Sequence, residues 1–144
     1  MNKVGVIDSE DSGFFKVARK KLSDCPVELV KWNASEEYDA VIISGHAAPT
    51  DSVIRGGAVI TPGGSRFKIE SKFAISYGMS SRDTITASSN SEDGIVIALS
   101  RDIVDFEGKT VQRQEFTSNW KMSAFNALPI AAVKILSGKT DLNS

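Results

Sequence analysis

Hydrophobic residues in the first half of the chain gather in short runs that end at polar residues or glycine, and the run Ala40–Ile43 is uninterrupted. Five runs predict strands, at residues 4–7, 27–32, 40–43, 58–61 and 73–77. Uninterrupted apolar runs are typical of strands buried on both faces, as in parallel sheets. Phe14, Val17, Ala18 and Leu22 recur at helical spacing, which predicts an amphipathic helix between the first two strands. This order of elements indicates an α/β domain.

The second half of the chain alternates apolar and polar residues instead. Three alternating segments predict further strands, at residues 84–88, 95–99 and 109–116. The Asp93-Gly94 pair predicts a hairpin loop over residues 90–94. Gly56-Gly57 and Gly63-Gly64 are interpreted as turns. Alternation is typical of antiparallel strands with one solvated face, so an antiparallel meander is expected here.

The last predicted element is a helix. Asn126 is expected to cap it, Pro129 to lie in its first turn, and Gly138 to follow its last turn. Residues 1–138 are therefore expected to form a single α/β domain, followed by a polar tail at residues 139–144. The fold class is a small two-layer or three-layer sheet with a parallel N-terminal half, an antiparallel C-terminal meander and a terminal helix.

Composition excludes several classes of function. The formal net charge of −1 gives no reason to expect a nucleic-acid partner or an anionic membrane surface. No apolar run reaches the roughly 20 residues that a membrane span requires, and residues 1–10 lack the apolar core of a signal peptide. Cys25 is the only cysteine, so neither an internal disulfide nor a four-ligand zinc site is expected. The expected location is cytoplasmic.

The candidate site lies where two predicted parallel strands end. In open α/β sheets ligands bind outside the carboxyl ends of the strands, so the loops after the first and third strands are expected to meet if those strands are neighbours. Such a meeting predicts a polar ligand-binding site. Its candidate residues are Asp8, Ser9, Asp11, Ser12, Ser44, Gly45 and His46.

Two alternatives to a ligand site stay open. Ser9, Asp11 or Ser12 can serve only to cap the first helix. A small enzyme can instead use Asp8, Glu10, Asp11 and His46 as acid and base groups, because histidine titrates near neutral pH. The carboxylates at positions 8, 10 and 11 do not have the spacing of a calcium loop, so no metal is predicted.

No cofactor and no catalytic residue are predicted, because neither G-x-G-x-x-G nor G-x-x-x-x-G-K-[ST] occurs in the chain. Trp120, Met122 and Phe125 cluster before the last helix. They either close the core or, if exposed, mark a surface for a protein partner or a homo-oligomer. The partner is therefore an unidentified small molecule or protein.

Residues 73–138 carry a resemblance to a known family. The segments Ile75-Ser76-Tyr77-Gly78, Asp83-Thr84-Ile85-Thr86-Ala87-Ser88 and Phe125-Asn126-Ala127 occur in the order found after the ATPase core of Mur ligases. Together with Arg101-Asp102-Ile103 and Gln114-Glu115-Phe116, they also resemble short uncharacterised proteins of clostridia and related Firmicutes. The phosphate loop and magnesium-binding acids of Mur ligases are absent. The resemblance therefore implies a relative that keeps the sheet of those enzymes but has lost their ATP chemistry.

The first 50 residues are similar to the opening of class I glutamine amidotransferases, through Val6-Ile7-Asp8 and the segment from Tyr38 to Gly45. The nucleophilic cysteine and His-x-Glu of those enzymes are absent. We therefore expect a non-catalytic module that binds a small molecule or a protein. The Mur ligase resemblance links it to cell-wall precursor metabolism, and the small enzyme described above is the alternative.

Overall fold

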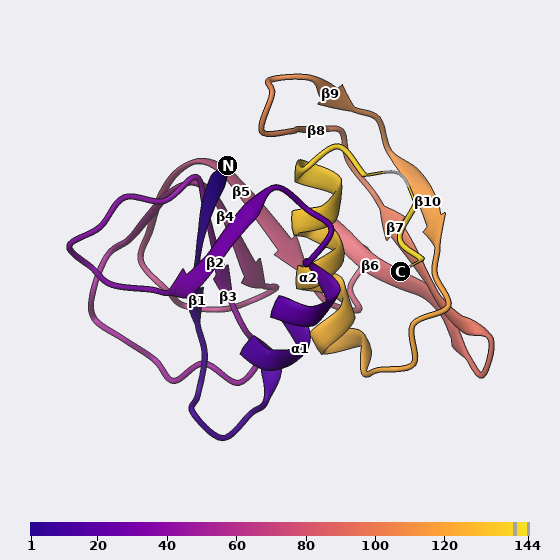
Figure 1. Cartoon of the computed structure of the whole chain (residues 1–144), viewed down its shortest axis with the longest axis horizontal. Coiled ribbons are helices and arrows are strands. Elements are labelled where there is room, and N and C mark those ends of the chain that lie inside the picture. Colours follow the sequence, from indigo (N-terminus) through magenta and orange to yellow (C-terminus); the bar gives the residue numbers. More distant parts are fainter. Residues whose placement is uncertain (140, 144) are drawn as a thin grey trace.

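The structure, a computed structural model, describes residues 1–139 and 141–143. Two helices and ten strands form in the order β1 (Asn2–Ile7), α1 (Phe14–Lys21), β2 (Val27–Lys31), β3 (Ala40–Ile43), β4 (Ile54–Pro62), β5 (Ile69–Tyr77), β6 (Ile85–Ser91), β7 (Gly94–Leu99), β8 (Ile103–Val104), β9 (Thr110–Val111), β10 (Gln114–Thr117) and α2 (Ala124–Leu136). The predicted fold class is confirmed: the fold is α/β, with parallel strands first, antiparallel strands afterwards and a terminal helix (Figure 1).

Eight strands form one sheet in the order β10-β7-β6-β5-β4-β3-β1-β2. Strands β1 to β6 are mutually parallel, whereas β7 pairs antiparallel with both β6 and β10. The order 2-1-3-4-5 in the parallel part is one of the two common orders of doubly wound sheets. The chain leaves β1 toward β2 on one side and leaves β3 toward β4 on the other. The gap between the ends of β1 and β3 is therefore the switch point of the topology.

The two faces of the sheet are covered differently. Both helices pack on one face, where Phe14 and Ala18 of α1 and Ile130 of α2 join a core with side chains of β1 and β3 to β7 (Figure 1). The other face has no helix among the described residues. The loops that connect β2, β3, β4 and β5 cover it, and Tyr38 and Phe67 belong to a smaller apolar cluster there. The domain therefore has two layers, the sheet and the pair of helices, and loops cover the other face of the sheet.

Both ends of α2 show why the helix has these bounds. Ser123, rather than the predicted Asn126, is the N-cap, and its hydroxyl accepts a hydrogen bond from the Asn126 amide at 3.3 Å. Pro129 lies in the second turn, not in the first. At the other end Gly138 has a φ of 84°, and the amides of Gly138 and Lys139 bond the carbonyls of Ile135 and Lys134. This pair of bonds is a Schellman motif, so the predicted role of Gly138 is confirmed.

Three further sequence predictions need correction. Gly56-Gly57 lies inside β4 rather than in a turn, and position 57 needs glycine because a Cβ there would lie only 2.8 Å from the carbonyl oxygen of Asp39. The segment 109–116 is divided: β9 pairs with β8 in a separate two-stranded sheet, and only β10 joins the main one. In the predicted polar tail Leu142 is buried in the core, whereas residues 140 and 144 lie outside the described part of the chain.

Candidate functional site

The loop after β1 folds back on itself through Asp8. Ser12 donates its hydroxyl hydrogen to the Asp8 carboxylate and accepts a hydrogen bond from the Phe14 amide at 3.0 Å. Gly13 then begins α1 with a φ of 74°, a conformation that glycine adopts without a Cβ penalty. Gly13 is therefore the N-cap of α1 in place of a predicted serine or aspartate, although Ser12 still satisfies the first helical amide.

The loop after β3 meets the same carboxylate. The Ser44 hydroxyl donates to Asp8 Oδ1 at 2.5 Å and accepts a hydrogen bond from the His46 amide at 3.1 Å. The Ser44 residue is only 1 % exposed. The prediction that the loops after the first and third strands are adjacent is confirmed, because β1 and β3 are neighbours. We call Asp8, Ser12 and Ser44 the carboxyl-edge cluster.

Tyr77 is a buried polar group beneath this cluster that the sequence pattern presented only as a strand residue. Its hydroxyl donates to the carbonyl oxygen of Ile43 at 2.6 Å. Burial raises the pKa of the Tyr77 phenol well above its usual value, and the charge of Asp8 raises it further. The phenol therefore stays protonated and ties the end of β5 to the end of β3.

The remaining predicted site residues do not join the cluster. Ser9 is half-buried, whereas Asp11, Gly45 and His46 are exposed. The His46 side chain makes no hydrogen bond or ion pair with the described residues; only its amide does. Within the described chain no three His, Cys, Asp or Glu side chains come together as a metal site.

A cleft of about 560 Å³ opens beside the cluster, at the carboxyl ends of β1 and β2. We call it the edge cleft. The β1–α1 loop forms one wall, the first turn of α1 another, and the end of β2 a third. Its lining residues are Val6, Ile7, Asp8, Ser9, Glu10, Gly13, Phe15, Lys16, Lys31 and Trp32. Sequence reasoning found Asp8, Ser9 and Glu10 but missed Lys31 and Trp32, although the same strand-end rule applies to β2.

The charged groups of the edge cleft are not paired with one another. Glu10, Lys16 and Lys31 are exposed, and their side chains make no hydrogen bond or ion pair within residues 1–139 and 141–143. Phe15 and Trp32 are half-buried beside them. The cleft thus combines charges of both signs with aromatic surface, the mixture that small-molecule sites use.

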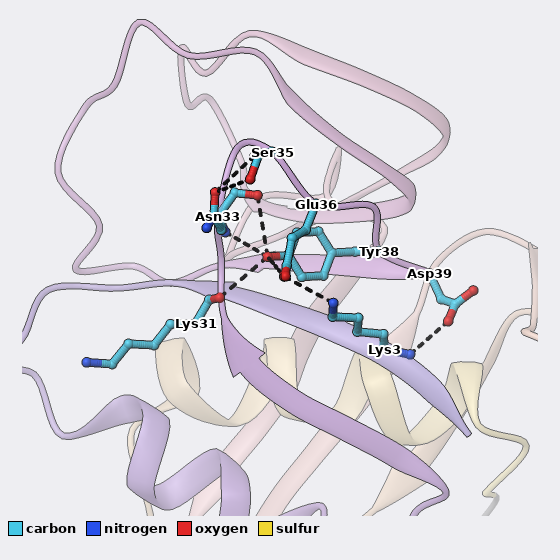
Figure 2. Close-up of polar contacts among 7 residues, drawn as sticks. All are labelled: Lys3, Lys31, Asn33, Ser35, Glu36, Tyr38 and Asp39. Carbon is cyan, nitrogen blue, oxygen red and sulfur yellow. Dashed lines mark hydrogen bonds and ion pairs between the residues drawn. The ribbon is translucent and has the colours of Figure 1, made fainter.

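A second polar network lies on the loop-covered face of the sheet, around Tyr38 (Figure 2). The Tyr38 hydroxyl accepts a hydrogen bond from the Asn33 amide at 2.7 Å, and its ring lies against Gly5, where a Cβ would be 2.8 Å away. Lys3 pairs with Glu36 at 3.0 Å, and its amide donates to Asp39 at 2.7 Å. Burial raises the pKa of the Tyr38 phenol. These contacts fix the β2–β3 connection against β1.

The aromatic group before α2 divides between core and surface. Trp120 is buried, whereas Phe125 is 51 % exposed, next to Gly45. Lys134 of α2 is fully buried, bonds Asp24 at 3.2 Å and lies 5.8 Å from the centre of the Trp120 ring. Cys25, beside Asp24, is buried, and burial raises the pKa of its thiol. This ion pair, in which only the Lys134 side is buried, joins α2 to the turn between α1 and β2.

Comparison of the chain with protein-family models, with curated proteins and with solved structures found no match. The described helices include none with the length and apolar character needed to cross a membrane.

Proposed function

We propose that the protein is a small-molecule binding module whose ligand occupies the edge cleft. One observation carries the proposal: a cleft of about 560 Å³ lies at the carboxyl ends of two parallel strands, next to the switch point between β1 and β3. Open α/β sheets bind ligands outside the carboxyl ends of their strands, and the edge cleft lies on the β2 side of that switch point. Ligand pockets commonly measure about 300–1,000 Å³, so the volume suits a small molecule.

The carboxyl-edge cluster supports this binding role indirectly. Its hydroxyl groups are engaged with Asp8, and Ser44 is buried, so these side chains shape the wall of the cleft by holding the two loops in place. The charged and aromatic side chains at the open side of the cleft contact the ligand. In this role the domain binds without transforming its ligand. The alternative, a small enzyme that uses Asp8, Glu10, Asp11 and His46, requires His46 to turn toward the cleft.

The segment that resembles Mur ligases, residues 73–138, lies outside the lining of the edge cleft. The binding proposal therefore does not depend on the link to cell-wall precursors, which we keep as a separate proposal. That link predicts that the ligand is a fragment of a cell-wall precursor, and the test below includes such compounds.

A thermal-shift screen tests the binding proposal. The panel contains nucleotides, UDP-sugars, amino acids, short peptides that include peptidoglycan peptides, and divalent cations. A ligand at a hundred times its Kd stabilises the fold by about 2.7 kcal/mol, which a melting curve resolves easily. We expect at least one organic compound to raise Tm. We also expect Ser9→Phe, which fills the cleft, to abolish the shift, whereas Ser23→Phe, at an exposed position in the turn after α1, retains it. A panel without a hit, or a hit that Ser9→Phe leaves unchanged, contradicts the proposal.

A further inference from the structure

The charges of the edge cleft restrict the class of ligand that fits there. Asp8 and Glu10 line the cleft from the β1–α1 loop, whereas Lys16 lines it from α1 and Lys31 from the end of β2. A phosphate or another purely anionic ligand would meet the two carboxylates. A purely cationic ligand would meet the two ammonium groups. Each class would bring a charge of the ligand next to a like charge of the cleft, and that repulsion favours a ligand that carries both signs.

Not every charged group that lines the cleft is available to a ligand, because one of them is already hydrogen-bonded within the protein. The Asp8 carboxylate accepts hydrogen bonds from Ser12 and Ser44, so its bonding capacity is largely used within the protein. Glu10, Lys16 and Lys31 make no such contacts with the described residues. One carboxylate and two ammonium groups are therefore ready to pair with a ligand that carries both signs of charge.

The apolar part of the cleft adds a third requirement. Phe15 and Trp32 are half-buried and line the same space as the charged groups. The guanidinium of Arg19 lies 5.2 Å from the centre of the Phe15 ring, so one aromatic surface is partly engaged and Trp32 is the more available of the two. An indole beside charged groups suits a ligand that has an apolar group next to its polar ends.

From these observations we propose that the edge cleft binds a zwitterion: an amino acid or a short peptide with a free α-ammonium group, a free α-carboxylate and an apolar side chain. Glu10 pairs with the ammonium group, Lys16 and Lys31 pair with the carboxylate, and Trp32 contacts the apolar side chain. This inference rests on the proposed binding function and names the ligand class for the same cleft.

Isothermal titration calorimetry with matched probes tests each pairing. The probes are phenylalanine, phenylalaninamide, which lacks the carboxylate, N-acetylphenylalanine, which lacks the ammonium group, and the dipeptide Phe-Phe. We expect one of the two zwitterions to bind at least tenfold more tightly than either blocked probe, and their order distinguishes a free amino acid from a peptide. Lys16→Gln and Lys31→Gln should weaken binding of the zwitterion but leave binding of phenylalaninamide unchanged. Glu10→Gln should weaken binding of the zwitterion but leave binding of N-acetylphenylalanine unchanged.

Control variants and failures are distinguishable. Lys20→Gln and Glu28→Gln remove exposed charges outside the cleft and should leave every titration unchanged. If the blocked probes bind as tightly as the zwitterions, or if the three cleft variants bind like the wild type, the zwitterion proposal is wrong. If another compound of the thermal-shift panel raises Tm and Ser9→Phe abolishes that shift, the proposed binding function stands and only the zwitterion proposal fails. If no compound binds in the cleft, both proposals fail.

Discussion

The carboxyl-edge cluster and the edge cleft share Asp8, but their polar groups have opposite environments. In the cluster the Asp8 carboxylate, the Ser12 hydroxyl and the buried Ser44 hydroxyl satisfy one another. In the cleft the side chains of Glu10, Lys16 and Lys31 are exposed and make no hydrogen bond or ion pair within the described chain. Mutual satisfaction is characteristic of groups that hold a fold together, whereas unpaired charges in a cleft remain available to a ligand. The difference assigns stability to one set of residues and binding to the other.

The largest expected effect is on the cluster. Asp8→Ala should lower the free energy of unfolding by about 2–4 kcal/mol, because hydrogen bonds to a charged acceptor are lost and the Ser44 hydroxyl stays buried without that acceptor. Urea denaturation measures the change. Asp11→Ala removes an exposed carboxylate from the same loop and should have almost no effect. Equal effects of the two variants would show that the cluster does not stabilise the fold.

The ion pair of Asp24 and Lys134 is a second stabilising contact between polar groups, and its contribution to stability should depend on pH. Burial raises the pKa of Asp24, but the hydrogen bond and charge of Lys134 outweigh it, so that the pKa lies below its usual value. The stability from this pair is therefore present above the unfolded-state pKa, about 3.9, and is lost as pH falls through the lower folded-state pKa.

Asp24→Asn should lower the free energy of unfolding at pH 7 by about 1–2 kcal/mol. This is less than for a fully buried pair, because Asp24 is 43 % exposed. Chemical denaturation at pH 7 and pH 2.5 measures both values. The difference between wild type and variant should shrink at the lower pH, and a difference independent of pH would exclude the ion pair as its cause.

The Tyr38 network should contribute less. Tyr38→Phe keeps the ring against Gly5 but removes the hydroxyl that accepts from the Asn33 amide, and about 1 kcal/mol of unfolding free energy should be lost (Figure 2). Guanidinium denaturation provides the measurement. A loss above about 3 kcal/mol would show that the hydroxyl holds more of the loop-covered face than its hydrogen bonds account for.

The smallest effect on stability is expected in the cleft. Lys16→Gln and Lys31→Gln should each change the free energy of unfolding by less than about 0.5 kcal/mol, because both side chains are exposed and unpaired among the described residues. Thermal melts without ligand measure this change. A destabilisation as large as that of Asp8→Ala would remove the distinction between the cluster and the cleft.

Much of the fold follows from the sequence because the strands are short and strongly patterned. The runs at residues 4–7 and 40–43 form β1 and β3, and the polar loops after them meet at Asp8 and Ser44 as predicted. The turn predicted at Gly56-Gly57 is wrong because glycine is required there by the close approach of the Asp39 backbone, which is distant in sequence. No local pattern records a contact of that kind.

The site was only partly predictable. Strand-end polar residues were found because they form one contiguous stretch after β1. The cleft also depends on Lys16 in a helix and on Lys31 and Trp32 at the end of a different strand, and only the pairing of β1 with β2 brings these side chains together. Tyr77 was missed because a tyrosine in an apolar strand gives no sign that its hydroxyl bonds the end of β3.

The two tryptophans allow the most direct test of the central claim, that the ligand binds in the edge cleft. Trp32 lines the cleft and Trp120 is buried in the core, so their indole N–H signals in a ¹H–¹⁵N NMR spectrum report on different places. During titration with phenylalanine or Phe-Phe, we expect the Trp32 signal to shift in proportion to saturation while the Trp120 signal stays in place. A Trp32 signal that stays fixed while the ligand binds would contradict this claim.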